Sequence, residues 1–142
     1  MKGGRFAAVL LVLTICRAGE VYDPRPVVRK CEAPRDEGTG SGSERKYFFN
    51  SNSRDCKAYT YTGHGGFYDQ VNRFNSRLEC ETTCRCYLRL DQGSGQLHSQ
   101  RYYYDRPGHS CNQFTYLGGG GNENNYYDRM ACRDACMSSG GR

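Results

Sequence analysis

The chain contains no tryptophan and, after its sixteenth residue, no long apolar run. Among its 142 residues there are only 4 prolines and 3 methionines. Without tryptophan, a core has to rely on smaller aromatic residues. Without an apolar run of about twenty residues, the later chain has no candidate for a membrane-spanning helix. The sequence also lacks an Asn-x-Ser/Thr acceptor, so we expect no N-glycosylation.

Signatures of catalysis are missing as well. His64, His98 and His109 are scattered along the chain. No Gly-x-Ser-x-Gly, His-Glu-x-x-His or catalytic-cysteine pattern accompanies them. The sequence therefore predicts a protein that is not an enzyme and that needs no cofactor and no metal.

The N-terminal segment has the pattern of a secretory signal peptide. A positively charged start precedes the apolar run 6–16, and the small residues Ala18 and Gly19 follow it. We expect cleavage after Ala18, because cleavage after Gly19 would place Arg17 where a small residue is needed. A buried N-terminal helix is the alternative. The expected location of the mature protein is extracellular.

Removal of residues 1–18 changes both the charge and the cysteine count. Lys2, Arg5 and Arg17 leave, so the net charge falls from +5 to +2, with 17 basic and 15 acidic side chains. This small charge gives little reason to expect nucleic acid or a membrane as a partner. Cys16 leaves too, and the 9 cysteines become 8. An even number of cysteines in a secreted chain indicates disulfides.

The remaining cysteines show that the chain is a tandem duplication. Their spacing is C-x24-C-x23-C-x3-C followed by C-x24-C-x20-C-x3-C. Aromatic segments repeat in step with them, since 45–50 matches 101–106 and 56–61 matches 111–116. A surplus of three residues in the first copy lies within 64–70. Cysteines and aromatic residues that share one period are strong signs of a repeat.

Each repeat of about 55 residues is too small for a stable core without disulfides. Its two aromatic-rich segments are separated by a turn and predict a β-hairpin. These segments are 45–50 and 57–61 in the first copy, and 101–105 and 112–116 in the second.

A short helix is expected to end each copy. Ser76 and Glu79 form the pattern of a capping box, and Asp128 is the corresponding cap in the second copy. Cysteines four residues apart, such as Cys80 and Cys84, share one helical face. Parallel side chains of this kind do not easily bond to each other, so each is expected to reach a different partner.

The stretch CETTCRC (80–86) admits two interpretations. Its three cysteines together with His64 resemble a set of zinc ligands. Cys86, however, is the first cysteine of the second copy, and an oxidising compartment disfavours free thiolates. The stretch is better explained as the junction of two disulfide domains, with Arg85 alone between them. We predict that such a short linker leaves the domains a limited range of orientations.

The hairpin, the capped helix and the order of the cysteines resemble the Kunitz domain of bovine pancreatic trypsin inhibitor. The resemblance covers residues 31–84 and 86–136 and includes the aromatic triplets and the C-x3-C helix ends. Further landmarks are Asn72 with Phe74, and Asn124 with Tyr126. The chain is most similar to two-domain salivary proteins of blood-feeding arthropods.

The resemblance implies a small disulfide-rich α+β fold with two tandem Kunitz-type domains, each a twisted β-hairpin plus a C-terminal helix. Residues 19–30 would then form an N-terminal extension and 137–142 a flexible tail. Four cysteines in a domain allow three pairings. The pairs that the resemblance implies are Cys31–Cys84, Cys56–Cys80, Cys86–Cys136 and Cys111–Cys132.

Both copies depart from the family at one bridge. Family members have six cysteines, and the second and fourth join the exposed loop to the hairpin. The positions that correspond to them are Gly40 and His64 in the first copy, and Gly95 and Gly119 in the second. Loss of a bridge that closes about 25 residues removes roughly 3 kcal/mol of stabilisation in the chain-entropy model.

Kunitz inhibitors present an exposed, rigid loop to a protease as a false substrate, and one specificity residue (P1) enters the protease pocket. The resemblance places these loops at Gly40, Ser41, Gly42 and Ser43, and at Gly95, Gln96, Leu97 and His98. The specificity residues are then Ser41 and Gln96. Neither suits a trypsin-like pocket, which accepts Lys or Arg, or a chymotrypsin-like pocket, which accepts a large apolar group.

We therefore expect a secreted Kunitz-type serine protease inhibitor of divergent type. Its expected partner is a protein, a serine protease, and its expected state is a monomer. The alternative is a binding module that keeps the Kunitz fold and acts on an ion channel, a receptor or a coagulation component without inhibiting a protease.

Overall fold

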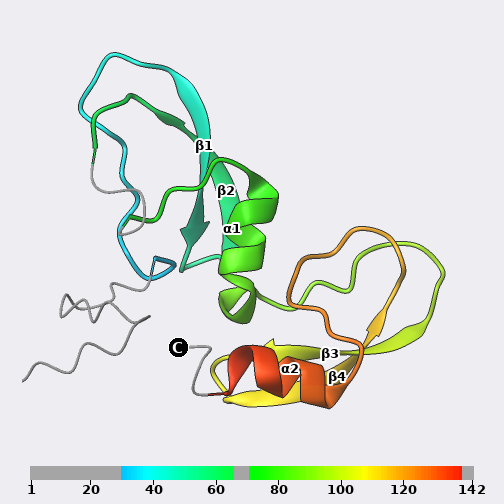
Figure 1. Ribbon diagram of the computed structural model, residues 1–142. Coiled ribbons are helices and arrows are strands. Elements are labelled where there is room, and N and C mark those ends of the chain that lie inside the picture. Colours follow the sequence, from blue (N-terminus) through cyan, green and yellow to red (C-terminus); the bar gives the residue numbers. More distant parts are fainter. Residues whose placement is uncertain (1–29, 66–70, 139–142) are drawn as a thin grey trace, which may run out of the picture.

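The computed structural model describes residues 30–65 and 71–138, which form two hairpin–helix units in succession (Figure 1). The expected signal peptide, the extension before Lys30 and the last four residues of the tail lie outside the described residues. Most of the segment that holds the three-residue surplus also lies outside them.

The first unit is built on an antiparallel hairpin of β1 (Glu44–Asn50) and β2 (Asp55–Tyr61). The register runs from Glu44 opposite Tyr61 to Asn50 opposite Asp55. Strand β2 begins two residues earlier than the sequence predicts. The reason is the tight turn, in which Asn50 Oδ1 accepts hydrogen bonds from the backbone N–H groups of two turn residues at 3.0 Å. Helix α1 (Arg77–Thr83) follows and packs on both strands.

The second unit repeats this arrangement. Strands β3 (Ser99–Asp105) and β4 (Ser110–Tyr116) pair with the same seven-residue register, and helix α2 (Arg129–Cys136) packs on them (Figure 1). A single 3-10 turn, η1 (Arg85–Tyr87), joins the two units. Met137 and Ser138, which the sequence assigns to a flexible tail, donate backbone hydrogen bonds to Arg133 O and so extend the last turn of α2.

Both helices begin at the predicted capping residues. Ser76 Oγ accepts a hydrogen bond from Glu79 N at 3.0 Å, and Asp128 Oδ1 accepts one from Ala131 N at 2.8 Å. The second half of the predicted capping box is shifted by one residue, because Glu79 Oε2 accepts from Asn75 N rather than from Ser76 N. Each cap satisfies a backbone N–H that the first turn of a helix leaves without a partner.

Disulfides attach each helix to its own unit. Cys56–Cys80 joins β2 to α1, and Cys111–Cys132 joins β4 to α2. Cys31–Cys84 and Cys86–Cys136 join the start of each unit to the end of its helix. These are the four pairs that the family resemblance implies. Cys80, Cys84 and Cys86 thus each have a separate disulfide partner, which leaves no thiolate for the zinc alternative.

The two small cores are organised around one buried asparagine each. Asn72 accepts a hydrogen bond from Phe49 N at 2.8 Å and donates to Phe49 O and to Ala33 O. Asn124 makes the same bonds with the backbone of Tyr104 and donates to Leu88 O at 2.9 Å. These bonds tie the start of each unit to its hairpin.

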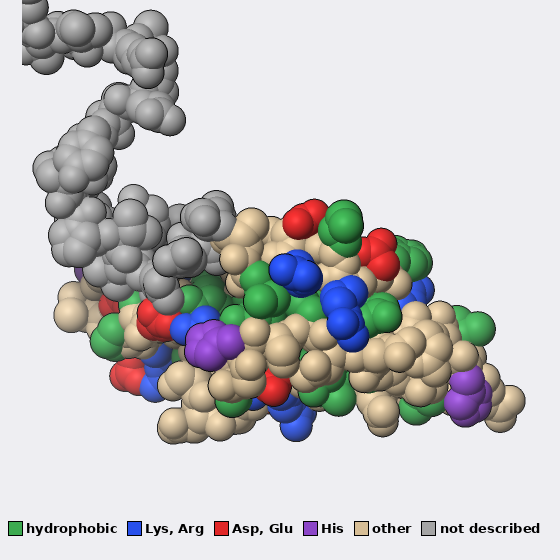
Figure 2. All heavy atoms as spheres, turned by 90° about the horizontal axis from the view of Figure 1, so that it is seen from below, with side chains coloured by type: hydrophobic (Ala, Val, Ile, Leu, Met, Phe, Trp, Pro, Cys, Tyr) green, Lys and Arg blue, Asp and Glu red, His purple; other side chains and the backbone are tan. Residues whose placement is uncertain are grey.

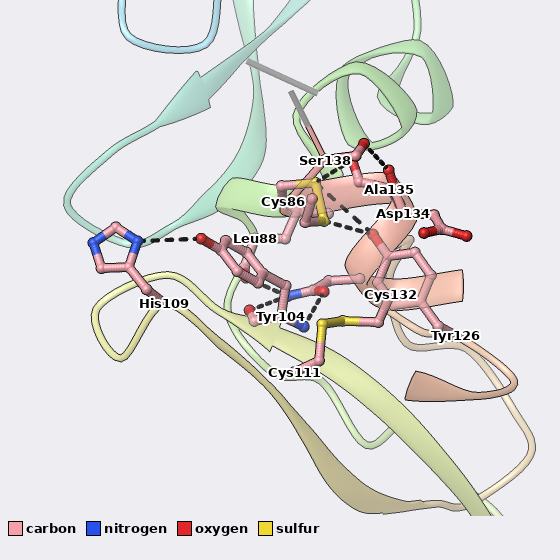
Figure 3. The surroundings of a disulfide bond; sticks show 12 residues. Cys86, Leu88, Tyr104, His109, Cys111, Tyr126, Cys132, Asp134, Ala135 and Ser138 are labelled. Atoms are coloured by element: carbon pink, nitrogen blue, oxygen red, sulfur yellow. Dashed lines mark hydrogen bonds between the residues drawn. A yellow bond between two sulfur atoms is a disulfide. The ribbon is translucent and has the colours of Figure 1, made fainter. Parts of the chain in front are cut away.

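Disulfide sulfur and aromatic rings fill the rest of each core. In the second unit, the disulfide Cys111–Cys132 packs with Tyr104 and Tyr126 (Figure 3). Tyr126 Oη lies 3.1 Å from Cys136 Sγ. Phe49 and Phe74 occupy the equivalent space in the first unit. Burial raises the pKa of Tyr126, as expected for a phenol enclosed by apolar groups.

Leu88 connects the two units. It belongs to the second repeat by sequence, but its side chain is only 1% exposed and packs in the core of the first unit. Around it, Arg54 Nε donates to Tyr87 O at 3.2 Å, and Arg89 N donates to Arg54 O at 3.0 Å. Arg106 adds an ion pair with Glu32 across the junction.

Candidate functional site

The two predicted loops lie at the open end of each hairpin, where the strands are farthest from their connecting turn (Figure 1). Ser41, Gly42 and Ser43 are exposed, and so are Gln96 and His98. Leu97 is 60% exposed, so a large apolar side chain lies at the surface of the second loop. The loops project from different sides of the molecule, so they face separate regions of solvent.

Backbone hydrogen bonds anchor the first loop to the chain that follows β2. Thr39 N and Gly40 N both donate to Gly63 O at 2.9 Å, and Gly42 N donates to Thr62 O at 2.7 Å. In return, Thr62 N donates to Glu37 O at 3.0 Å. The loop is therefore fixed on both sides of Ser41, while the Ser41 side chain remains free to contact another molecule.

The second loop has a similar anchor with fewer bonds. Ser94 and Gly119 exchange a pair of backbone hydrogen bonds of 2.6 and 2.7 Å. Beyond them, Leu97 N donates to Leu117 O at 3.1 Å. His98 Nδ1 also lies 3.0 Å from Gln96 O and so folds back over its own loop.

The residues at the lost bridge lie side by side, although no covalent bond joins them. A Cβ atom added to Gly40 would lie 2.8 Å from His64 Nδ1 and 2.5 Å from Thr62 O. At Gly95, with φ of +111°, an added Cβ would lie 2.7 Å from Leu117 O. Cβ atoms do not approach other heavy atoms this closely. Glycine at both positions therefore lets the loop backbone lie directly against the segment after the second strand of its hairpin. Direct backbone hydrogen bonds join the two segments at these positions.

One glycine before each loop is required by geometry. Gly38 has φ of +77° and Gly93 has φ of +70°, in the region that residues with a Cβ rarely adopt. A Cβ at Gly38 would also lie 2.5 Å from Gly63 O, and a Cβ at Gly93 would collide with Gly119 O. The two glycines therefore allow the chain to turn against the segment that anchors the loop.

The base of the first loop is partly buried and contains a perturbed phenol. Tyr59 Oη donates a hydrogen bond to Asp36 O at 2.7 Å. Burial raises the pKa of Tyr59 to about 12; nearby Arg73 opposes this shift and Asp36 adds to it. The tyrosine therefore stays protonated, and able to donate this hydrogen bond, through the physiological range.

Asp36 and Arg73 are not among the site residues that the sequence predicts. The only sequence signal for the first is a repeated Asp-x-Gly, at 36–38 and 91–93. In both copies the aspartate Oδ1 accepts a hydrogen bond from the glycine N at 3.0 Å. For Arg73 no local pattern distinguishes it from other basic residues, because its burial depends on the hairpin packed against it.

The described residues show no arrangement for metal binding. Within 30–65 and 71–138, no three His, Cys, Asp or Glu side chains are grouped so as to hold an ion. No helix in these ranges has the length and apolar character needed to cross a membrane. On the face seen in Figure 2, basic, acidic and hydrophobic side chains are interspersed, with no single kind gathered in one area.

Comparison with known proteins gives consistent matches over both units. The sequence profile of the Kunitz/bovine pancreatic trypsin inhibitor domain matches residues 30–85 and again 85–137. BPTI/Kunitz domain-containing protein 5 of Margaritifera margaritifera is 30% identical over 138 residues, which cover 90% of this chain and 71% of the relative. Kunitz-type serine protease inhibitor bitisilin-3 of Bitis gabonica is 33% identical, over 75% of this chain and 70% of the relative.

A solved structure also resembles the chain. The NMR structure of Ixolaris, determined with its interaction with factor X, has a TM-score of 0.48 and 27% identity. The match covers 77% of this chain and 95% of Ixolaris. From the two profile matches and the relatives of at least 30% identity, the chain belongs to the Kunitz/bovine pancreatic trypsin inhibitor domain family, of which it carries two copies.

Proposed function

We propose that the protein is a secreted serine protease inhibitor of divergent Kunitz type that acts through its exposed loops. The observation that carries this proposal is the loop around Ser41, exposed at its tip and held by backbone hydrogen bonds on both sides. A loop that is ordered before binding loses less conformational freedom when a protease encloses it, and this raises affinity. The similarity to bitisilin-3, which is named as a serine protease inhibitor, also supports protease inhibition as the function.

In this mechanism the protein is a ligand and performs no catalysis. The side chain of Ser41 or Gln96 enters the pocket of the protease, and the adjoining peptide bond lies against the protease nucleophile. Anchoring keeps the ends of the loop in place, so the complex dissociates without productive cleavage. Ser41 is small and uncharged, so it fits a shallow pocket of the elastase type better than the pockets for Lys, Arg or large apolar residues.

Extracellular action is part of the proposal. The four disulfides support it, because such bonds persist in oxidising compartments. We propose that the chain acts as a monomer on a protein partner.

The binding-module alternative is favoured by one observation at the second loop. Gln96 does not fit the usual pockets, and the bulky Leu97 that follows it is 60% exposed. A loop of this kind suits an apolar contact on a channel, receptor or coagulation protein as well as it suits a protease.

Titration of the oxidised full chain against trypsin, chymotrypsin, elastase, thrombin and factor Xa tests the proposal. We expect inhibition of an elastase-type enzyme by the natural sequence, and new trypsin inhibition by Ser41→Arg. Gln96→Arg makes the same change in the second loop. Asn52→Arg, in the turn at the opposite end of the hairpin, adds the same charge away from the loop and should inhibit nothing new. If neither loop variant gains trypsin inhibition at micromolar concentration, the loop mechanism is wrong.

A further inference from the structure

The base of the first loop contains an ionic contact that the second loop lacks. The carboxylate of Asp36 uses one oxygen to accept a hydrogen bond from Gly38 N. Its other oxygen forms an ion pair with Arg73 Nη1. The two side chains are only 17% and 9% exposed. An ion pair at this depth is screened little by solvent, so removal of either partner leaves a poorly solvated charge.

Two tyrosines of β2 complete the contact. The guanidinium of Arg73 lies 4.2 Å from the centre of the Tyr61 ring, and Tyr59 Oη donates to Asp36 O at 2.7 Å. Tyr61 directly precedes Thr62 and Gly63, whose carbonyls accept the hydrogen bonds of the loop. We call Asp36, Tyr59, Tyr61 and Arg73 the loop-base network. It connects the segment before the loop with the segment that anchors it.

The second domain keeps only part of this network. By cysteine spacing, Asp91, Phe114, Tyr116 and Asn125 correspond to Asp36, Tyr59, Tyr61 and Arg73. Phe114 has no hydroxyl to donate, and Asn125 carries no charge. Asn125 Oδ1 is buried without a hydrogen-bond partner among the described residues. Tyr116 Oη donates to Gly120 O instead. Only the bond from Gly93 N to Asp91 Oδ1 remains.

We propose that Asp36 and Arg73 are positioning residues that hold the first loop in order in place of the lost bridge, and that the first loop is therefore the tighter-binding of the two. The affinity part of this inference rests on the proposed function. The ordering part does not, because it concerns the free protein. An ordered loop has less freedom to lose on binding, so the domain with the complete network binds more tightly.

Amide hydrogen exchange in the oxidised full chain tests the ordering directly. In Arg73→Met and in Asp36→Asn, we expect the Thr39, Gly40 and Gly42 amides to exchange about tenfold faster, since loop opening becomes easier. Asn at position 36 can still accept the bond from Gly38 N, so this variant isolates the ion pair. The Ser94 and Leu97 amides of the second loop should not change. If the first-loop amides exchange at their original rate, the network does not hold the loop.

Glu37→Gln is the matched control. The Glu37 carboxylate pairs with Arg35 in the same segment, but it is 64% exposed. Exposed pairs contribute little, so removal of this charge should leave loop exchange unchanged. A change as large as that in Asp36→Asn would contradict the specific role of the buried pair.

Loss of Arg73 could prevent folding, which fast hydrogen exchange of the Phe49 amide would reveal. A reciprocal variant in the second domain keeps the inference testable in that case. Asn125→Arg combined with Phe114→Tyr builds the missing contacts beside Asp91. We expect slower exchange of the Ser94 and Leu97 amides in this variant. If a folded double variant shows no slowing, the inference is wrong for both domains.

Inhibition separates this inference from the proposed function. On the Ser41→Arg background, we expect Arg73→Met to raise the trypsin inhibition constant about tenfold. Gln96→Arg should inhibit more weakly than Ser41→Arg. Faster loop exchange without inhibition by any variant would support the positioning role and overturn the proposed function. If the variants inhibit but first-loop amide exchange is unchanged in Arg73→Met and Asp36→Asn, the proposed function is supported and the positioning role is overturned.

Discussion

At the scale of single residues, stability depends on a few buried polar groups that have complete sets of partners. Asn72 and Asn124 are buried, and each makes three hydrogen bonds. Both residues are landmarks of the family resemblance, but their partners are backbone atoms of distant segments. Only the folded chain brings those atoms together.

Substitution of Asn72 should therefore be strongly destabilising. We expect Asn72→Ala to lower the free energy of unfolding by about 3 kcal/mol, because the Phe49 N–H and two carbonyls lose their partner in the core. Denaturant unfolding of the oxidised chain measures the change. Asn52→Ala, at an exposed turn position, should change stability by less than about 0.5 kcal/mol. A similar small effect for Asn72→Ala would show that water replaces the lost bonds.

The phenol of Tyr59 makes stability depend on alkaline pH. Its pKa is about 12 in the folded chain, against about 10 when unfolded. Because the folded pKa is raised, the stabilisation is fully present below pH 10 and is lost as pH rises from about 10 to about 12. Rapid pH-jump absorbance of phenolate should show a late-titrating component, to which the buried Tyr126 also contributes, and Tyr59→Phe should make this component smaller. Simultaneous ionisation of all tyrosines would contradict this assignment.

At the scale of elements, the hairpins and helices follow from local sequence, and the loops follow from close backbone contact. Aromatic-rich segments separated by a turn explain the hairpins, and Ser76 and Asp128 explain where the helices begin. The loop around Ser41 has no such local rule. Its shape depends on Gly38 and Gly40, where a side chain would occupy the space of the anchoring segment.

Gly38 and Gly63 have nearly the same φ angle, so substitutions at these two positions distinguish the cost of backbone strain from the cost of a steric clash. Gly63 has φ of +84° and open space around its Cβ position, whereas a Cβ at Gly38 would collide with Gly63 O. We expect Gly63→Ala to cost about 1 kcal/mol from backbone strain alone. Gly38→Ala should cost more and should also speed exchange of the Thr39 and Gly40 amides. Equal effects in the unfolding and exchange measurements would show that the loop adapts without loss of its anchor.

At the scale of the whole molecule, the junction belongs to both domains at once. Leu88 fills the core of the first domain, while its carbonyl accepts hydrogen bonds from Asn124 of the second domain and from Arg54 of the first. The sequence predicts restricted domain motion from the short linker alone. The contacts at Leu88 provide a physical means for that restriction, and the restriction itself stays a prediction.

Small-angle scattering should find a narrow range of domain separations in the oxidised chain. We expect Leu88→Ala to widen this range and to lower the stability of the first domain by about 3 kcal/mol, because it leaves a cavity in that core. Leu90→Ala, at a side chain that is 37% exposed, is the control and should change neither property. A broad range of separations in the natural sequence would contradict the prediction.

The sequence by itself determined the duplication, the type and order of the strands and helices, and the residues that cap the helices. These features depend on local propensity and on cysteine spacing, which are written along the chain. Only the tertiary structure decided how the loops are held without their bridge. Gly40 approaches Thr62, and Asp36 meets Arg73 across 37 residues, because the hairpin brings distant segments together. Such contacts depend on distances in space, and no residue pattern along the chain encodes them directly.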